Sequence, residues 1–385
     1  MGWMIAKERL DDTQRNIVSA SASENTNLFI HGPAGCGKSV VLVHIVQEIL
    51  DKNPEAGVVM ISFTRALLEL YKTGVRADLL NRVQFCTMEG FKKGNYRPCQ
   101  FIVIDEIQDS DLHLLNIIKP SSCRVLVAGD FYQSIYDNKC ALSDIQSLEN
   151  IQQPLLPVIY RNTKSIHAIA SFFAEFPEEY RAYDVDNKQQ DTSVQLAEFS
   201  SKLKEIAYVW SKARLLAEGG DNVVIILPNQ EKVLNFFSAV CLLESLNPWV
   251  LAHNRYNKPD YGALNSYCQQ QKLPICYLGN SYGSLKRIYD ENIVTVMTYH
   301  SAKGLDFDSV FLPELTHDAQ LWNSSTIERR LFFVALTRAR KSLFISYFGE
   351  PHAFIKLIPE HTVVKAKDIT ANEVVLDDDY EEIMF

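Results

Sequence analysis

Short apolar runs alternate with longer, mixed stretches along the first 150 residues of the chain. The runs at 28–30, 57–62, 101–104 and 124–129 are mostly apolar, which is typical of strands that are buried on both faces. Stretches with helical periodicity, such as 64–72, separate the runs. Strands that alternate with helices predict a parallel sheet with helices on both faces.

The same alternation restarts in the second half of the chain. Helices are expected at 163–173, 230–245 and 325–338, whereas 176–192 and 253–272 are polar and irregular. The expected strands are 155–159, 223–227, 248–251, 293–297, 309–312 and 342–346. This pattern predicts a second α/β domain behind the first.

The composition is that of a globular protein with two domains. The chain has 385 residues, of which 47% are hydrophobic and 22% are charged. No apolar run reaches the roughly 18–20 residues that span a bilayer, and residues 1–9 do not resemble a signal peptide. The eight cysteines have no metal-binding spacing, so we expect reduced thiols in the cytoplasm and no membrane partner.

The charge is distributed unevenly. The net charge is −9, and residues 363–385 carry −5 of it, which leaves −4 for residues 1–362. No global positive field would therefore attract nucleic acid, so any such contact must be local. We expect domains at 1–150 and 151–362, followed by an acidic tail at 363–385 that is solvated or docks a protein partner.

Residues 28–39 predict a phosphate-binding loop. The pattern G-x-x-x-x-G-K-S lies between an expected strand and an expected helix. Backbone amides of the loop would surround the phosphates of ATP, Lys38 would reach the β- and γ-phosphates, and Ser39 would bind Mg²⁺. The loop positions are Gly32, Pro33, Ala34, Gly35, Cys36, Gly37, Lys38 and Ser39. The alternative is an ordinary glycine-rich turn.

Two carboxylates end the apolar run at 101–104. In a phosphate-loop protein, Asp105 at the end of a buried strand would bind Mg²⁺, and Glu106 would act as general base for the attacking water. The alternative is a pair of surface acids at a strand end. These residues together predict hydrolysis of ATP.

Six further segments show what class of ATPase this sequence resembles. They resemble elements of superfamily 1 helicases of the UvrD, Rep and PcrA type. Among these elements are D-E-x-Q-D, G-D-x-x-Q-S-I-Y and T-x-H-x-A-K-G-L-E-F, and in the last of them Asp306 stands here in place of Glu. The six segments are 10–15, 105–109, 129–136, 160–162, 296–307 and 330–340. They occur in the family's order, so the resemblance implies two RecA-like domains with ATP in the cleft between them.

The resemblance also implies roles for single residues around ATP. Gln14 would read the adenine edge, and Gln133 would contact the γ-phosphate or the attacking water. Arg161 and Arg338 would come from the second domain as arginine fingers, and Gly304 and Asp306 would approach the ribose and phosphates. For Gln14 and the arginines, the alternative is an ordinary structural or surface role.

Single-stranded DNA is the partner that the resemblance implies. Phe63, Thr64 and Thr87 would contact it from the first domain, and Thr298 and His300 from the second, since hydroxyls suit phosphates and aromatic rings suit bases. Phe63 has core packing as its alternative role. The family moves 3′ to 5′ along the strand.

Some positions depart from the family pattern. Glu89 stands where the family has His, and 137–140 lack the family's stacking Trp, which Phe131, Tyr132 or Tyr136 would have to replace. The spacing also leaves no room for large accessory insertions. We therefore expect a compact, Mg²⁺-dependent, DNA-stimulated ATPase that is a translocase or helicase and binds a single strand or a tailed duplex. The alternative is a nucleic-acid-sensing subunit that regulates a partner, such as a nuclease in phage defence or DNA repair, whereas a metabolic kinase would not need these segments.

Overall fold

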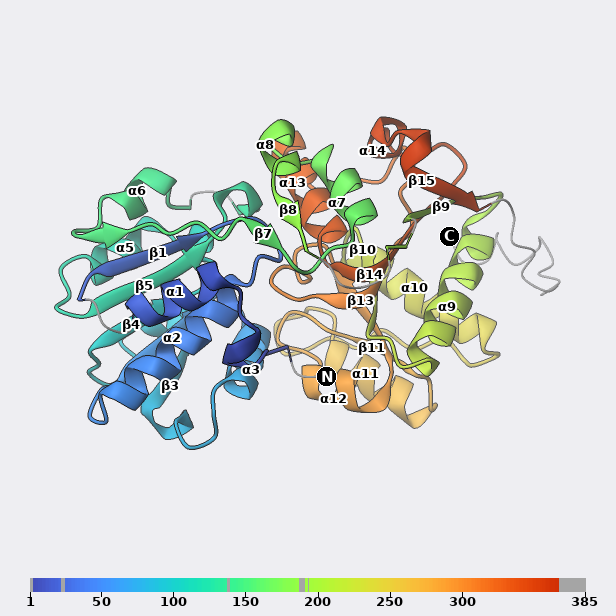
Figure 1. The fold of residues 1–385 in the computed structure, drawn as a ribbon. Coiled ribbons are helices and arrows are strands. Elements are labelled where there is room, and N and C mark those ends of the chain that lie inside the picture. Colours follow the sequence, from blue (N-terminus) through green and yellow to red (C-terminus); the bar gives the residue numbers. More distant parts are fainter. Residues whose placement is uncertain (1–2, 22–24, 137–138, 187–190, 193, 367–385) are drawn as a thin grey trace. The chain divides into compact units, whose positions relative to one another are not determined.

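The computed structural model describes residues 3–21, 25–136, 139–186, 191–192 and 194–366. The chain divides into two compact units. The first unit comprises residues 1–161 and 174–187, and the second comprises 162–173 and 188–385. Each unit is built around one parallel sheet (Figure 1).

The first unit contains a six-stranded sheet in the order β3-β2-β4-β5-β1-β6. Its strands are β1 (Asn27–His31), β2 (Val58–Ser62), β3 (Val83–Thr87), β4 (Phe101–Ile104), β5 (Arg124–Gly129) and β6 (Ile151–Gln152), with β7 (Val158–Ile159) and β8 (Asp184–Val185) forming a separate pair. Its helices are α1 (Asp12–Ser21), α2 (Lys38–Lys52), α3 (Arg65–Gly74), α4 (Met88–Lys92), α5 (Leu112–Ile118), α6 (Leu142–Gln146) and α8 (Pro177–Arg181).

Helices cover both faces of this sheet because the strand order reverses after β3. The path from β1 through β2 to β3 runs toward one edge of the sheet, and α2 and α3 pack together along it with α1. The path from β4 to β5 runs the other way, so a right-handed crossover places α5 on the opposite face. That face holds a core of strand residues and apolar side chains such as Phe91, Leu115 and Ile145.

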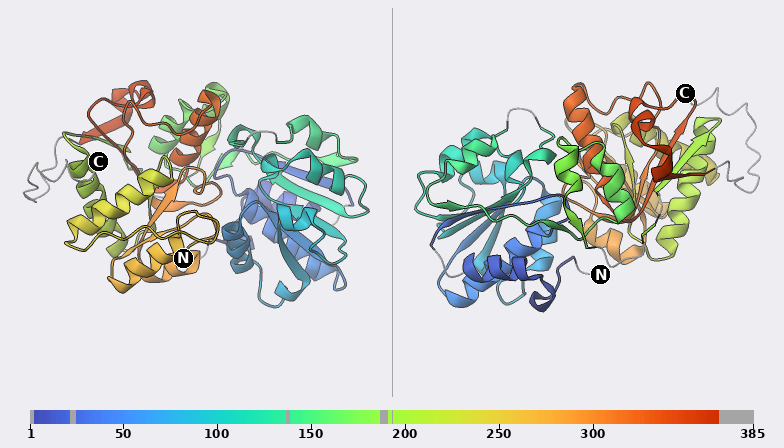
Figure 2. Two further views of the ribbon diagram at one scale, coloured as in Figure 1. Left: turned by 180° about the vertical axis from the view of Figure 1, so that it is seen from behind. Right: turned by 45° about the horizontal axis from the view of Figure 1, so that its top comes forward.

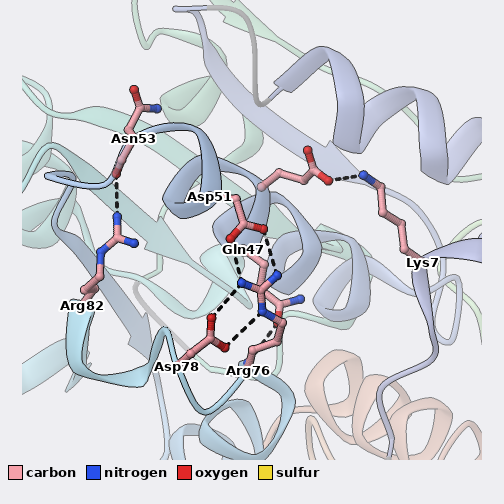
Figure 3. Close-up of polar contacts among 8 residues, drawn as sticks. Lys7, Gln47, Asp51, Asn53, Arg76, Asp78 and Arg82 are labelled. Atoms are coloured by element: carbon pink, nitrogen blue, oxygen red, sulfur yellow. Dashed lines mark hydrogen bonds and ion pairs between the residues drawn. The ribbon is translucent and has the colours of Figure 1, made fainter.

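An ion-pair cluster fixes the C-terminal end of α2. The Arg76 guanidinium donates to both carboxylate oxygens of Asp51, at 2.9 and 2.7 Å, and also contacts Asp78, while the Arg76 N–H donates to Gln47 (Figure 3). Arg82 donates to the carbonyl of Asn53 at the same helix end. The hydrogen bonds of Asp78 and Asp51 raise the pKa of Arg76, although the cluster is exposed. It aligns α2, which begins in the predicted phosphate loop.

The first unit extends past the expected boundary at residue 150. The chain from 154 to 161 runs along β1, with the Leu156 N–H donating to the His31 carbonyl at 2.9 Å and the Tyr160 N–H donating to the Gly35 carbonyl at 2.9 Å. Arg161 therefore belongs to the first unit, whereas we expected it in the second domain. The next residue, Asn162, is buried in the second unit, where its amide donates to the Ala339 carbonyl at 2.7 Å.

The second unit contains a seven-stranded sheet in the order β11-β12-β10-β13-β14-β9-β15. Its strands are β9 (Val194–Phe199), β10 (Val223–Leu227), β11 (Ile275–Tyr277), β12 (Val294–Thr298), β13 (Phe307–Leu312), β14 (Ala339–Phe348) and β15 (Val363–Ala366). Its helices are α7 (Lys164–Ser171), α9 (Lys202–Glu218), α10 (Gln230–Leu243), α11 (Tyr261–Gln270), α12 (Leu285–Glu291), α13 (Ser325–Leu336) and α14 (Ala353–Leu357).

This second sheet is also covered on both faces. The side chains of α9, α10 and α11 form one core with the strands, through residues such as Trp210, Phe236 and Leu264. The crossover from β13 to β14 runs in the opposite direction, so α13 lies on the other face, together with α7. Figure 2 shows the same layers from two further directions.

Three sequence expectations differ from the structure of this unit. Residues 248–251 were expected to form a strand, but they lie in a loop where Val250 is 84% exposed. Burial of apolar side chains therefore does not offset the conformational entropy that these residues would lose in a sheet. Residues 253–272 were expected to be irregular, but they contain α11, whose N-terminus Asp260 caps. Residues 363–366 of the expected tail form β15, which pairs with β9, and residues 367–385 lie outside the described part of the chain.

None of the helices in the described part of the chain has both the length and the apolar run that a bilayer-spanning helix needs.

Candidate nucleotide-binding and nucleic-acid-binding sites

The predicted residues of the first unit gather at one edge of its sheet. The phosphate loop follows β1, Phe63 follows β2, and Thr87 ends β3. Asp105 follows β4, and Asp130 follows β5. Because all these strands are parallel, their carboxyl ends meet at this edge, where ligands of open α/β sheets bind. Topology alone thus brings together side chains that lie up to about a hundred positions apart in the sequence.

The phosphate loop adopts a curled backbone that requires glycine. Gly35 and Gly37 have φ values of 80° and 90°, in the left-handed region that side chains disfavour. A Cβ on Gly35 would lie 2.6 Å from the Arg161 Cβ, so the segment at 154–161 also closes on the loop. The remaining loop positions between Gly32 and Ser39 are Pro33, Ala34 and Cys36, and α2 begins directly behind the loop, at Lys38.

Lys38 lies inside the loop, and its ammonium group is hydrogen-bonded to the loop backbone. Its Nζ donates to the carbonyls of Gly32 and Pro33, at 2.7 and 2.9 Å. Burial lowers the pKa of Lys38, but the attraction of Cys36, Asp130 and the acids after β4 outweighs it and raises the pKa. Burial also raises the pKa of the Cys36 thiol.

Asp105 is buried between two hydroxyl groups. Ser39 Oγ and Tyr71 Oη both donate to Asp105 Oδ2, the second at 2.6 Å. Burial and the charge of Glu106 raise the pKa of Asp105, and the two hydroxyl groups oppose that shift. A carboxylate beside a serine hydroxyl is a donor set of hard oxygens, which suits Mg²⁺. Tyr71 could not be predicted as part of the site, because nothing in the sequence pattern of its helix distinguishes it from a core tyrosine.

A chain of hydrogen bonds connects the end of β4 with the end of β5. The Gln108 amide donates to the Glu106 carboxylate and accepts from the Asp130 N–H at 3.1 Å. Gln133 in turn donates to Asp130 at 2.6 Å. Glu106 has a φ of 55°, an uncommon conformation for glutamate that re-aims its side chain away from the strand direction. The predicted residues Glu106 and Gln133 are thus linked through Gln108 and Asp130, which lie within the quoted segments but were given no role.

Gln14 lies against the phosphate loop. Its amide nitrogen donates to the Cys36 carbonyl at 3.1 Å, and its amide oxygen accepts from the Asp11 N–H at 3.2 Å. Asp11 also accepts a hydrogen bond from the Tyr160 hydroxyl. The structure therefore places Gln14 beside the loop, with both ends of the amide bound to protein groups.

An aromatic and basic cluster lies beside the ends of β2 and β5. The rings of Phe63 and Tyr136 are 4.7 Å apart, and the Lys139 ammonium lies 5.4 Å from the first and 5.6 Å from the second. Tyr136 thus packs against Phe63 in the segment that lacks the family's tryptophan. Residues 137–138 of that segment lie outside the described residues.

The two predicted threonines of the first unit have a structural role as well. Thr64 accepts a hydrogen bond from the Leu67 N–H at 3.2 Å, and Thr87 accepts one from the Gly90 N–H at 3.0 Å. Each therefore caps a helix N-terminus. Because these bonds use only the hydroxyl oxygen as acceptor, each hydroxyl hydrogen is still able to donate to a phosphate.

In the second unit, the predicted residues lie at both ends of the strands. Thr298 ends β12 and donates to Ser301 at 3.0 Å, and His300 packs against Trp322 with ring centroids 4.3 Å apart. Burial, together with Lys303, lowers the pKa of His300 to about 4, so its ring is neutral at pH 7. Trp322 is 40% exposed and was not singled out from the sequence.

Arg338 and Asp306 lie at the opposite ends of their strands, just before β14 and β13. Arg338 is 2% exposed, and its guanidinium donates to the carbonyls of Val334 and Leu305, at 2.8 and 3.1 Å. Asp306 pairs with Arg340. Gly304, with a φ of 82°, forms the turn between Lys303 and Leu305. These contacts hold the predicted residues in place within the second unit.

Two parts of the chain match models of known protein families. The UvrD-like helicase C-terminal domain matches residues 275–350, and an AAA domain matches residues 14–139. The chain is 28% identical over 222 residues to the ATP-dependent DNA helicase UvrD1 of Mycobacterium leprae, which covers 55% of the chain and 26% of that protein. It is 36% identical over 95 residues to the ATP-dependent DNA helicase Rep of Buchnera aphidicola, which covers 20% of the chain and 14% of that protein.

A third relative and two solved structures extend the comparison. The RecBCD enzyme subunit RecB of Chlamydia pneumoniae is 20% identical over 288 residues, or 68% of the chain and 26% of that protein. The chain thus spans about a quarter or less of the length of these three relatives. The PRRSV helicase has a TM-score of 0.43 at 18% identity, covering 86% of this chain and 54% of its own. The arterivirus nonstructural protein 10 helicase has a TM-score of 0.43 at 13% identity, covering 89% and 64%.

Proposed function

This chain belongs to the UvrD-like superfamily 1 helicases, and on that premise we propose that it hydrolyses ATP at the phosphate-loop edge of its first unit and is stimulated by single-stranded DNA. The observation that carries the proposal is the convergence of three groups at that edge. The buried Lys38 ammonium, the Ser39 hydroxyl and the Asp105 carboxylate come from separate segments and meet there. A glycine-rich turn without function would need neither a buried ammonium nor a buried carboxylate beside it.

Lys38 and the loop amides would bind the phosphates of ATP. In the structure the ammonium occupies the loop through the carbonyls of Gly32 and Pro33, which are neutral partners. A phosphate oxygen is a stronger partner because its hydrogen bond with an ammonium is assisted by charge on both sides. ATP binding would therefore redirect Lys38 from the carbonyls to the β- and γ-phosphates.

Mg²⁺ would be held by Ser39 and Asp105. Their oxygen donors fit a hard cation that keeps most of its water ligands and needs few protein groups. When it is bound, it supplies positive charge to the phosphate oxygens. Tyr71, which donates to the same Asp105 oxygen, would orient the carboxylate.

Glu106 would accept the proton of the attacking water. Gln108 fixes its carboxylate by donating to it, and the same glutamine accepts from the Asp130 backbone. Gln133 is bound to the side chain of Asp130 at 2.6 Å. We infer that Gln133 contacts the γ-phosphate or the water, so that loss of the γ-phosphate is passed to the segment that carries Tyr136. Gln14 is assigned to the adenine, and Arg161 and Arg338 to the γ-phosphate, as further parts of this proposal.

Single-stranded DNA would be bound by residues of both units. Phe63, Tyr136 and Lys139 combine two aromatic faces with a positive charge, which suits a base and its phosphate. In the second unit, the neutral His300 ring would stack on a base, and the Thr298 hydroxyl would contact a phosphate. We propose that the protein translocates 3′ to 5′ on such a strand, in the cytoplasm, and that a tailed duplex is a further substrate.

A second candidate is a regulatory ATPase that unwinds little DNA itself. The observation that favours it is the shortness of the segments between motifs. Between β2 and β4 the described chain forms α3, a short 3-10 helix at Leu80–Arg82, β3 and α4. Between β10 and β12 it forms α10, α11, β11 and α12. Neither segment forms a further compact unit among the described residues. Such a protein would act with a partner, for example a nuclease in phage defence or DNA repair, with residues 367–385 as a candidate docking segment.

The test is ATP turnover by the full chain with and without a single-stranded oligo(dT). We expect at least tenfold stimulation by the oligonucleotide, and a loss of turnover of at least about 10²-fold for Lys38→Ala, because the Lys38 charge stabilises the transferred phosphoryl group. Turnover retained by Lys38→Ala would overturn the nucleotide site. If the oligonucleotide did not stimulate turnover and a 3′-tailed duplex were not separated, the regulatory candidate would be favoured. If the native protein always purified without a partner, the regulatory candidate would be contradicted.

A further inference from the structure

The second unit contains one long segment that is strongly depleted in acidic residues. Residues 245–289 carry five cations and one acid, a net charge of +4 in a chain of net charge −9. The charged residues of the segment are Arg255, Lys258, Asp260, Lys272, Lys286 and Arg287. None of them belongs to the segments that identified the family. A reversal of charge over 45 consecutive residues indicates a surface that meets a negative partner.

Four of these cations, Arg255, Lys258, Lys272 and Lys286, have no ion pair with an acid among the residues that the structure describes. Asp260, the acid of the segment, accepts hydrogen bonds from the N–H groups of Gly262 and Ala263 at the start of α11. Arg287 pairs with Glu291 at 2.8 Å. No ion pair of Arg255 or Lys258 with a described acid is found, and both side chains are exposed. Their charges are therefore available to a ligand.

Arg255 and Lys258 lie on a hairpin formed by residues 252–260. The Asp260 N–H donates to the Ala252 carbonyl, and the Asn254 N–H donates to the Lys258 carbonyl, both at 2.8 Å. The Asn254 side chain accepts from the Tyr256 and Lys258 N–H groups and donates to Tyr282 at 3.1 Å. Tyr282 packs against the core of the second unit. The tip of the hairpin is thus held in one shape and attached to the body of the unit.

Exposed apolar side chains lie at this hairpin together with the cations. Tyr256, at the tip, is 67% exposed, and Val250 and Leu251, just before the hairpin, are 84% and 44% exposed. The Arg255 guanidinium lies 4.7 Å from the centre of the Tyr256 ring, a cation–π arrangement. Neither the core nor the sheet of the unit requires these groups at the surface. An aromatic face combined with cations is the chemistry that binds single strands, since rings stack on bases and cations neutralise phosphates.

We propose that the 252–260 hairpin is a binding site for single-stranded nucleic acid, with Tyr256 stacking on a base and Arg255 and Lys258 neutralising phosphates. This site is separate from Thr298, His300 and the other predicted contacts, and it rests on the proposed function, because it gives the same strand a further contact. The charge decides between nucleic acid and a protein as the occupant. Two exposed cations beside an exposed ring complement a polyanion, whereas an apolar protein interface would not need unpaired cations around its aromatic residue.

The experiment measures binding of fluorescein-labelled oligo(dT) to the full chain by anisotropy over a range of NaCl concentrations. For the double variant Arg255→Ala/Lys258→Ala we expect about tenfold weaker binding at about 0.1 M NaCl, and a salt slope that is smaller by about 1.4, the value for two phosphates of a single strand. For Tyr256→Ala we expect about tenfold weaker binding, and for Tyr256→Phe close to wild-type binding, because the ring is retained.

The control is Lys204→Ala/Lys356→Ala, which removes two exposed cations of the same unit from α9 and α14, of which Lys356 pairs with Glu350. It should leave the affinity within twofold of wild type and the salt slope unchanged. Equal losses in this control would mean that net charge alone matters, and they would overturn the proposal. Unchanged binding by all hairpin variants would also overturn it and leave the surface to a protein. Failure of the wild-type chain to bind oligo(dT) at all would instead contradict the proposed function.

Discussion

Arg338 shows how a residue predicted for catalysis also holds its unit together. Its guanidinium donates to the carbonyls of Val334 and Leu305 and to the Thr337 hydroxyl, all within the second unit. The bonds join the end of α13 to the turn before β13. A sequence motif identifies such an arginine, but it does not reveal that the donors are bound to buried carbonyl groups.

We therefore expect Arg338→Ala to destabilise the protein in addition to any effect on turnover. Loss of the donors removes the hydrogen bonds of this side chain to two buried carbonyls, of which Val334 still accepts from the Thr337 hydroxyl, so the change costs about 2 kcal/mol and lowers Tm by about 4–8 °C. The measurement is thermal unfolding, with Arg214→Ala as a control that removes an arginine about 43% exposed in the same unit. If both variants lowered Tm equally, the buried hydrogen bonds of Arg338 would contribute no special stability.

At the scale of elements, a buried carboxylate joins α9 to the end of the second sheet. Glu205 is fully buried and accepts from the Ser346 hydroxyl of β14 at 2.6 Å and from the Glu314 N–H at 2.9 Å. Burial raises the pKa of Glu205 to about 7; the hydrogen bonds oppose the shift, the Glu314 charge adds to it, and Lys202 reduces it. The contact between α9 and the second sheet therefore stabilises the folded protein most when Glu205 is protonated.

The pH dependence of stability follows from that shift. Between pH 4.5 and about 7 the folded protein binds more protons at Glu205 than the unfolded chain, so this residue makes stability fall as the pH rises through that window. The shift corresponds to about 3 kcal/mol. Glu205→Gln keeps an oxygen acceptor and removes the charge, so it should raise Tm relative to wild type at pH 8 and change it little at pH 4.5. Parallel curves of Tm against pH for the two proteins would contradict the assignment.

At the scale of the whole molecule, the chain passes from one unit to the other within a single predicted segment. Residues 160–162 form one of the six segments that resemble the helicase family, but Tyr160 and Arg161 belong to the first unit and Asn162 to the second. The chain returns to the first unit at Ala174 and leaves it again after Asn187. The units are therefore not two consecutive pieces of sequence, although the pattern of apolar runs predicts that they are.

This interleaving predicts how truncated chains behave. A fragment of residues 1–150 lacks β6, which pairs with β1, and three further backbone hydrogen bonds, from His31 to Pro154, from Leu156 to His31 and from Tyr160 to Gly35. At roughly 1 kcal/mol each, the loss of these three bonds alone should make this fragment at least about 3 kcal/mol less stable than a fragment of residues 1–161. Urea unfolding of the two fragments provides the measurement, and equal midpoints would mean that residues 154–161 do not stabilise the first unit.

The sequence predicted the regular parts of the fold well. Buried strands such as 58–61, 101–104 and 223–227 are continuous apolar runs, and continuous burial on both faces is what a parallel sheet imposes. Short or edge strands such as β6, β8 and β15 were not predicted. Each has only two to four residues and pairs with a single other strand, so its sequence shows no recognisable pattern of apolar and polar positions. The exposed stretch at 248–251 was misassigned because its composition resembles a strand and its exposure is decided elsewhere in the fold.

The candidate site divides in the same way. Gly32, Lys38, Ser39, Asp105 and Glu106 were predicted from the sequence alone, because the phosphate-loop pattern and the acids after a strand consist of fixed residue types at fixed local spacing. Only the tertiary structure brought Tyr71 to Asp105, Gln108 to Asp130 and Arg161 to Gly35. Those contacts join segments far apart in the chain, and their partners are set by the order of parallel strands, which no local spacing encodes. The sequence by itself determined the chemistry at the end of each strand, and the folding of the sheet decided which of those ends meet.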